Sequence, residues 1–125
     1  MAQVLGIGGV FFKTEDPAAL AAWYDRVLGF GGGAWSGAMW PHGDRGCTIW
    51  SPFKADTTYF EPSTSPFMIN FIVDDLDGVL ARAASAGVEP TGRDDTDDNG
   101  RFAWLMDPAG LKIELWEPAP EPSEP

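Results

Sequence analysis

The sequence has one cysteine, Cys47, so the chain cannot form an intramolecular disulfide. Disulfide frameworks are typical of oxidising compartments, and no cysteine pattern points to one here. The sequence also lacks an apolar run of the roughly 20 residues that a membrane-spanning helix needs. A basic segment followed by an apolar core, typical of a signal peptide, is missing from the N-terminus. We therefore expect a cytoplasmic protein with no membrane partner.

Basic residues are scarce as well. The chain has 8 Lys and Arg against 19 Asp and Glu, which gives a net charge of -11. Binding to a phosphate backbone needs a basic surface, so the composition argues against a nucleic-acid partner. A cationic ligand is electrostatically compatible, although acidity also serves solubility. Apolar residues are abundant, at 44% with 13% aromatic, and predict a packed domain.

An internal repeat organises the chain. Residues 5–60 and 66–117 each contain a β-prone run, an acidic pair, a helical pattern and a closing strand. Between helix and closing strand each copy has room for two further short strands. The predicted unit is strand, helix and three strands, used twice in a single domain over residues 1–117. The Pro- and Glu-rich tail, residues 118–125, is predicted to lie outside it.

The ends of the two helices carry matching signals. Asp16 and Asp75 are predicted N-caps, whose side chains accept from free backbone N–H groups. Pro17 suits the first helical position, where its missing N–H would be unpaired anyway. Gly29 and Gly87 fit the left-handed position just past each helix. These signals place the helices at equivalent points of the two copies.

The additional strands are predicted from short β-prone runs. In the first copy we expect them around residues 33–35 and 38–40, and in the second around residues 88–90 and 101–105. The acidic stretch over residues 92–100 is predicted to be a solvated loop, because it cannot bury its charges.

The closing strand of the second copy contains one carboxylate, Glu114, among apolar residues. Aligning the turn glycines Gly46 and Gly110 pairs Glu114 with Trp50 of the first copy. A carboxylate in an apolar strand is costly to bury without a partner, so we predict a functional or hydrogen-bonded role. Lys112, on the same face of the strand, is an alternative partner that would make Glu114 one half of an ordinary ion pair.

Three segments carry a resemblance to a known superfamily: WYDRVLGF at 23–30, VDDLD at 73–77 and DPAGLKIELWEP at 107–118. In this repeated arrangement the chain resembles the vicinal oxygen chelate superfamily, which includes glyoxalase I, bleomycin-resistance proteins and extradiol dioxygenases. The resemblance implies an α+β fold, in which two βαβββ repeats form a curved half-barrel sheet with the helices on its outer face. It also implies a homodimer.

In metal-dependent members, as the resemblance implies, four strand side chains chelate a divalent metal. Glu114 falls on one ligand position, and the others fall on Gly9, Met68 and Trp50. None of these three supplies an imidazole or carboxylate, and a divalent metal needs several such donors. We therefore predict no cofactor and disfavour a metal. His42, the single histidine, lies in a turn and is the weaker alternative ligand.

Strand alternation predicts which side chains surround Glu114. Thr48 is expected to face the cavity, whereas Cys47 and Leu105 are expected to pack toward helices. Strand aromatics are also typical of cores and dimer interfaces, so this interpretation competes with a purely structural one. The predicted ligand-binding residues are Phe11, Trp50, Tyr59, Met68, Asn70, Trp104, Met106, Lys112 and Trp116.

Three functions remain open at this point. The first is a metal-free protein that binds a small, partly aromatic or cationic ligand, similar to the drug-binding bleomycin-resistance members. The second is a lyase, isomerase or dioxygenase-type enzyme that uses Glu114 as a base or metal ligand. The third is a non-catalytic dimeric interaction module whose own side chains fill the cavity. The aromatic lining favours the first.

Overall fold

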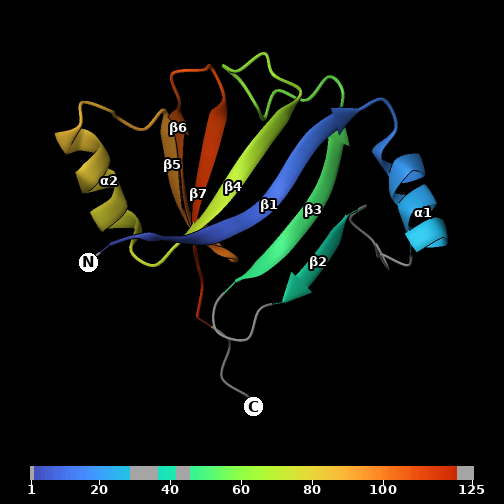
Figure 1. The fold of residues 1–125 in the computed structure, drawn as a ribbon, viewed down its shortest axis with the longest axis horizontal. Coiled ribbons are helices and arrows are strands. Elements are labelled where there is room, and N and C mark those ends of the chain that lie inside the picture. The colour runs from blue at the N-terminus through green and yellow to red at the C-terminus, as the bar shows by residue number, and fades with distance from the viewer. Residues whose placement is uncertain (1, 29–36, 42–45, 121–125) are drawn as a thin grey trace.

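The computed structural model describes residues 2–28, 37–41 and 46–120. Within these residues a seven-stranded sheet has the order β2-β3-β1-β4-β7-β6-β5, and it is curved and open (Figure 1). The helices are α1 (Pro17–Leu28) and α2 (Leu76–Ser85). The strands are β1 (Val4–Thr14), β2 (Ala38–Pro41), β3 (Cys47–Lys54), β4 (Phe67–Val73), β5 (Gly92–Asp97), β6 (Gly100–Met106) and β7 (Lys112–Pro118).

The sheet is built from the two predicted repeats. β1 and β4, the first strands of the repeats, pair antiparallel at its centre. Each also pairs in parallel with the last strand of its own repeat, β1 with β3 and β4 with β7. This confirms the predicted α+β half-barrel of two repeats. β2 matches the predicted strand at 38–40, whereas the one predicted at 33–35 lies outside the described residues.

The helices begin where the sequence predicts. The Asp16 carboxylate accepts from a backbone N–H three residues on, at 3.0 Å, and Pro17 opens α1. Asp75 caps α2 in the same way, at 3.1 Å, and Gly87 after α2 has a φ of 85°. Gly29 lies outside the described residues. Of the helices in the part of the chain that the structure describes, none is long and apolar enough to cross a membrane.

The acidic segment of the second repeat departs from the prediction. Residues 88–90 form no strand, and the stretch expected to be a loop forms β5, the edge strand beside β6. An edge strand keeps its charges in solvent, so it does not have to bury them. Its charges are also paired: Arg93 and Arg101 both contact Asp77 of α2 and Asp95, at 2.6 to 3.0 Å.

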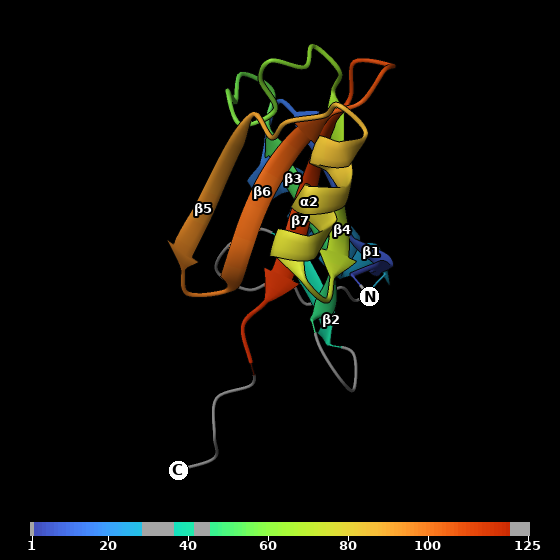
Figure 2. The same cartoon turned by 90° about the vertical axis from the view of Figure 1, so that its left-hand side faces the viewer.

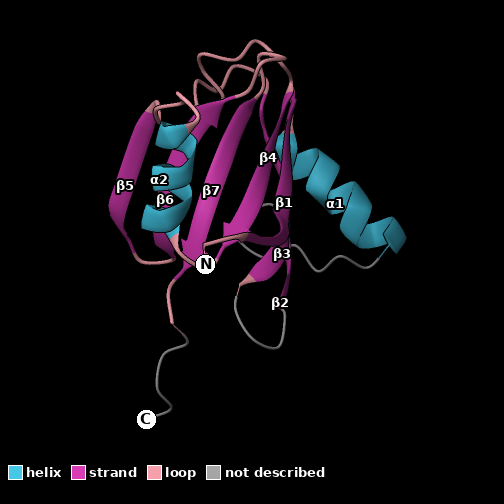
Figure 3. Cartoon of the chain, turned by 60° about the vertical axis from the view of Figure 1, so that its left-hand side comes forward, coloured by secondary structure: helices cyan, strands magenta, loops and turns pink. Residues whose placement is uncertain are grey.

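The two faces of the sheet have different roles. α2 covers β6 and β7 on one face, and α1 contacts β1 and β3, so one helix lies beside each half of the sheet (Figures 2 and 3). Leu105 packs against the α2 core as predicted. This core consists of Val73, Leu76, Leu80, Ala103 and Leu115. The opposite, concave face is lined by buried side chains of two clusters: Phe11, Phe60 and Met68, and Cys47, Ile72 and Trp116.

Candidate functional site

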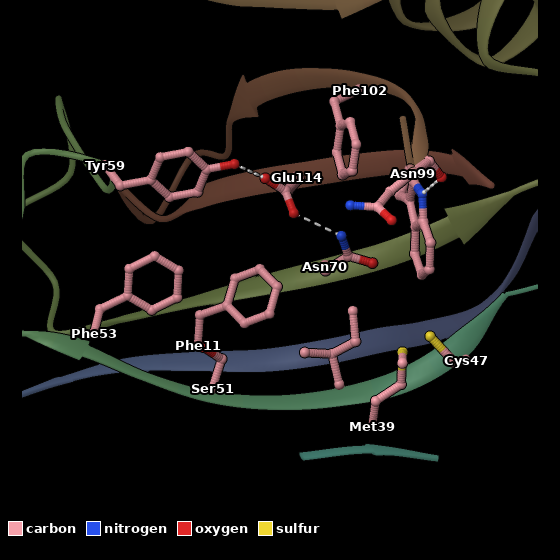
Figure 4. Close-up of a pocket in the computed structure, with 12 residues that line it drawn as sticks. Phe11, Met39, Cys47, Ser51, Phe53, Tyr59, Asn70, Asn99, Phe102 and Glu114 are labelled. Atoms are coloured by element: carbon pink, nitrogen blue, oxygen red, sulfur yellow. Dashed lines mark hydrogen bonds between the residues drawn. The ribbon is translucent and has the colours of Figure 1, made fainter. Parts of the chain in front are cut away.

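A cavity of about 500 Å³ opens on the concave face of the sheet (Figure 4). A cavity of this volume can hold a small organic molecule. Its walls are mainly apolar, and polar side chains reach it at only a few points. The lining residues are Phe11, Met39, Cys47, Ile49, Ser51, Phe53, Tyr59, Asn70, Asn99, Phe102, Glu114 and Trp116.

Glu114 reaches the cavity because of strand alternation. Its neighbours in β7, Ile113 and Leu115, pack on the core beneath α2. Successive side chains of a strand point to opposite faces, so Glu114 points to the concave side. Only 2% of its surface is exposed. The carboxylate is therefore a buried charge, and its stability depends on the groups that contact it.

Three uncharged donors surround this carboxylate. The Tyr59 hydroxyl and the Trp104 indole N–H both donate to Oε2, the latter at 2.8 Å. The Asn70 side-chain amide donates to Oε1 at 2.7 Å. Hydrogen bonds from neutral groups to a carboxylate are short and strong, and these replace the water that burial removes. The hydrogen-bonded role predicted for Glu114 is what the contacts provide.

Lys112 does not provide the ion pair that the sequence left open. Among the described residues no ion pair joins it to Glu114; its ammonium instead donates to the Tyr59 backbone carbonyl at 2.6 Å. The ammonium also lies 5.1 Å from the Tyr59 ring centre and 5.4 Å from that of Trp104. Burial lowers the pKa of Lys112, and the negative charge of Glu114 raises it by a smaller amount. Burial and the same charge raise the pKa of Tyr59, which keeps its hydroxyl a donor.

The side-chain oxygen of Asn70 accepts no hydrogen bond from the described residues. The side chain is 1% exposed, and among the described groups no hydrogen-bond partner lies within reach of Oδ1. Only the N–H₂ end can face a carboxylate, so the contact with Glu114 fixes which end is the oxygen. Figure 4 shows this oxygen turned away from Glu114, toward the side where Cys47 lies. Gly8 allows this position, since a Cβ there would lie 2.1 Å from Oδ1.

The predicted orientation of β3 is wrong. Thr48 and Trp50 were expected to face the cavity and Cys47 to face a helix, but the alternation is reversed. Trp50 packs on the other face, where its ring centre is 5.6 Å from that of Phe12. Burial raises the pKa of the Cys47 thiol. The β3 side chains that line the cavity are Cys47, Ile49, Ser51 and Phe53.

The register of the sheet explains this error. β4 and β7 place Asn70 beside Glu114, and β1 and β3 place Phe11 beside Ser51. In each repeat the pair joins the first strand to the last strand, and Ser51 faces Phe11 as Glu114 faces Asn70. Ser51, not Trp50, is therefore the counterpart of Glu114 in the first repeat. Aligning the turn glycines misses it by one residue, and a shift of one residue in a strand moves every side chain to the opposite face.

The remaining predicted residues fall into three groups. Phe11, Tyr59, Asn70 and Trp116 line the cavity with Glu114. Trp104 and Met68 lie beside it, Trp104 through its hydrogen bond to Glu114 and Met68 in the cluster with Phe11. Met106 and Lys112 pair at the far end of β6 and β7 and are not part of the lining. The lining residues that the sequence interpretation missed are Met39, Cys47, Ile49, Ser51, Phe53, Asn99 and Phe102.

A signal for one of these was present in the sequence. Phe102 lies two residues before Trp104, which was correctly assigned to the concave face, so alternation alone would have included it. Its ring is nearly parallel to that of Trp104 on one side and of Trp116 on the other, at 12° and 6°. Asn99 had no comparable signal, because it lies in the turn before β6 and its carbonyl accepts from Trp116 at 2.9 Å.

The side chains present do not fit a divalent metal. No three His, Cys, Asp or Glu residues come together in the described ranges 2–28, 37–41 and 46–120. The groups directed at Glu114 are N–H and O–H donors, whereas a metal needs lone pairs. Of the positions implied by the resemblance, Gly9 has no side chain, Met68 has only a soft thioether, and Ser51, which takes the place expected for Trp50, has only a hydroxyl. His42 lies outside the described residues.

Comparisons with known proteins agree with this architecture. The family model of the glyoxalase-like domain matches residues 9–116. A solved methylmalonyl-CoA epimerase in complex with methylmalonyl-CoA and NH4+ is similar at a TM-score of 0.72 and 18% identity, over 94% of this chain and 96% of that one. The epimerase from Mycobacterium tuberculosis gives 0.63 and 20%, over 94% and 91%. A catechol 2,3-dioxygenase gives 0.58 and 22%, over 100% of this chain and 43% of that chain.

The sheet of two repeats with its concave face has the fold expected from the resemblance to the vicinal oxygen chelate superfamily. Within it, the chain belongs to the glyoxalase-like domain family. No curated protein matches it in sequence. The solved structures are too distant in sequence to show more than the shared fold, so the function has to be argued from the cavity itself.

Proposed function

We propose that this protein binds a small, flat and largely apolar molecule in the concave cavity, without a metal ion. The observation that carries the proposal is the hydrogen bonding of Glu114. Tyr59, Trp104 and Asn70 donate to both of its oxygens inside an otherwise apolar cavity. A carboxylate held in this way is a fixed polar point in the wall, and fixed polar points orient a ligand in an apolar pocket.

The walls suit a flat ligand. The nearly parallel rings of Phe102 and Trp116 form one side, with Trp104 stacked beside Phe102, and Phe11 and Phe53 line the cavity from other strands. Aromatic rings contribute large contact areas with little loss of conformational entropy. The open volume of about 500 Å³ supports ligand binding over an interaction module whose cavity is filled by its own side chains.

The charge of the site is compatible with a neutral or a cationic ligand. Glu114 contacts only uncharged donors, and the whole chain carries a net charge of -11. A coenzyme A ester, the ligand named for one structural neighbour, carries several phosphate charges that this field would repel. We therefore favour a partly aromatic ligand without anionic groups.

The proposal is tested first by elemental analysis and a ligand screen on the same purified protein. We expect divalent metal far below one ion per chain and a rise in melting temperature with flat aromatic compounds. A ligand at 100 times its Kd stabilises the folded state by about 2.7 kcal/mol, a shift of several degrees for a domain of this size. Stoichiometric metal that is lost on Glu114→Ala would contradict the metal-free site.

Two aromatic residues of β3 provide a matched pair of variants. Phe53 lines the cavity and Trp50 packs on the opposite face. We expect Phe53→Ala to weaken binding of a screening hit by about tenfold, since a buried aromatic side chain contributes a kilocalorie or more of contact energy. Trp50→Ala should leave the affinity of the folded protein unchanged. The reverse order would place the ligand elsewhere.

A proton-transfer enzyme is the second candidate, favoured by one observation. Glu114 Oε1 accepts a hydrogen bond from Asn70 alone among the described residues, while Oε2 accepts two, which leaves Oε1 with a lone pair that could accept a proton. Epimerisation needs proton-transfer groups on both faces of a carbon. Glu114 is the only carboxylate in the described lining of the cavity, which makes the binding role the better supported. Deuterium incorporation into a bound carbon acid, lost in Glu114→Gln, would favour the enzyme instead.

A further inference from the structure

The unpaired oxygen of Asn70 is the one polar atom of the cavity region that folding leaves unsatisfied among the described buried side chains. A buried carbonyl without a partner costs free energy that a ligand can recover. Asn70 lies in β4 at the centre of the sheet, between the aromatic cluster around Phe11 and the cluster around Trp116. Its position is therefore at the middle of the cavity wall.

The orientation of this oxygen follows from its neighbours. The Asn70 N–H₂ end is held at 2.7 Å by Glu114, so the amide cannot turn over without placing two oxygens together. On the other side Gly8 leaves the space that Oδ1 occupies, since any Cβ at Gly8 would lie 2.1 Å from it. Gly8 and the buried Glu114 carboxylate together fix the direction of this acceptor, which belongs to a cavity-lining residue and is itself buried.

We infer that the ligand of this cavity carries a hydrogen-bond donor, N–H or O–H, that contacts Oδ1 of Asn70. The inference rests on the proposed function and specifies the chemical class of its ligand. The apolar body of the ligand lies against the rings of Phe102 and Trp116, and its donor group faces β4. An isostere with an acceptor in place of the donor meets a carbonyl oxygen and is rejected.

The test uses pairs of compounds that differ only in this donor. Indole is compared with benzofuran, and 2-naphthol with 2-fluoronaphthalene, by titration followed in ¹H–¹⁵N spectra of the protein. We expect the donor compound of each pair to bind about tenfold more tightly, because the isostere leaves Oδ1 buried and unpaired. Equal affinity within both pairs overturns the inference and leaves the proposed function standing. If none of the compounds binds, both the inference and the proposed function are contradicted.

Glu114→Gln provides a sharper test, because it should reverse the preference. The Trp104 indole N–H can only donate, so the oxygen of the new amide must stay at the position of Oε2. Its N–H₂ group then faces Asn70, which has to turn its amide over and accept with Oδ1. The Asn70 N–H₂ group replaces the oxygen in the cavity wall. We expect benzofuran to bind this variant at least as tightly as indole.

Two further variants separate Asn70 from other polar groups. Ser51→Ala removes a hydroxyl from the opposite strand without touching Asn70, and should keep the wild-type preference for donors. Gly8→Ala displaces the Asn70 oxygen and should reduce that preference to near unity. A preference that Glu114→Gln weakens without reversing would place the donor on Glu114, and would overturn the inference. The comparison within the wild-type protein stands even if a variant does not fold.

Discussion

Glu114 is stabilised by its hydrogen-bond donors and not by an opposite charge. Burying a carboxylate costs several kilocalories, and three donated hydrogen bonds offset that cost. Each donor comes from a different place in the chain: Tyr59 from the loop after β3, Asn70 from β4 and Trp104 from β6. Asn70 and Trp104 are register partners of Glu114 in the sheet, so the carboxylate adds side-chain bonds to strands already paired and also holds the loop that carries Tyr59.

Tyr59→Phe tests the contribution of one donor. The variant keeps the ring, which stacks on Phe53 with centres 5.5 Å apart, and removes only the hydroxyl. We expect the free energy of unfolding to fall by about 1.5–3 kcal/mol, the range for a hydrogen bond to a charged group. Chemical denaturation measures this. An unchanged free energy would mean that water replaces the hydroxyl at no cost.

The difference in unfolding free energy between wild type and Tyr59→Phe should also depend on pH. The pKa of Tyr59 is raised in the folded state by burial and by the Glu114 charge. The hydroxyl thus contributes its full stability below the ordinary tyrosine pKa of about 10, and this contribution is lost as the pH rises toward the folded value. We expect the stability difference between wild type and Tyr59→Phe to be constant from about pH 7 to 9 and to shrink above about pH 10. A difference that grows in alkali would contradict this.

At the scale of elements, the turn between β5 and β6 determines one end of the cavity. Gly100 opens β6 with a φ of 135°, and a Cβ there would lie 2.2 Å from the Glu117 backbone oxygen. Asn99, just before it, accepts from the Trp116 indole at 2.9 Å. Gly100 therefore positions Asn99, which lines the cavity and also accepts the hydrogen bond from the Trp116 ring.

Gly100→Ala and Gly110→Ala form a matched pair. Gly110 also has a positive φ, of 85°, but a Cβ there would meet no atom within 4 Å. We expect Gly110→Ala to cost about 1 kcal/mol, the strain of a left-handed residue, and Gly100→Ala to cost at least about 2 kcal/mol more, since the backbone must move. Gly100→Ala should also weaken ligand binding, whereas Gly110→Ala should not. Equal costs would show that the turn relaxes freely.

At the scale of the whole molecule, the homodimer implied by the superfamily resemblance stays a prediction. Within the part of the chain that the structure describes, the sheet has two edges, β2 and β5. β5 is lined with charges and β2 has four residues ending in proline, so neither edge favours pairing with another strand. β1 instead carries aliphatic side chains that are about half exposed. These are Val4, Leu5, Ile7 and Val10.

We expect a second copy of the chain to cover this part of β1. Sedimentation analysis at micromolar concentration should detect a dimer, and Ile7→Glu should convert it to a monomer because a charge is costly in an apolar interface. Val88→Glu, at an exposed apolar residue after α2, is the control and should leave the dimer intact. A monomeric wild type would contradict the expectation.

Local patterns were enough to predict the framework of the fold. Asp16, Pro17 and Asp75 mark the helix starts through backbone chemistry that acts within a single turn, and the structure agrees with each. The repeat predicted two similar units, and the superfamily resemblance implied that their strands form a half-barrel. β5 was missed because a charged edge strand and a solvated loop have the same composition.

The sequence by itself determined that the chain would form two βαβββ units and that Glu114, inside an apolar strand, would have a functional or hydrogen-bonded role. Only the tertiary structure decided what surrounds that carboxylate. The parallel register of β3 against β1 turned Ser51 inward and Trp50 outward, and a register depends on pairing between distant strands. The loop that brings Tyr59 to Glu114 and the glycine that leaves Asn70 Oδ1 unpaired depend on the same long-range packing.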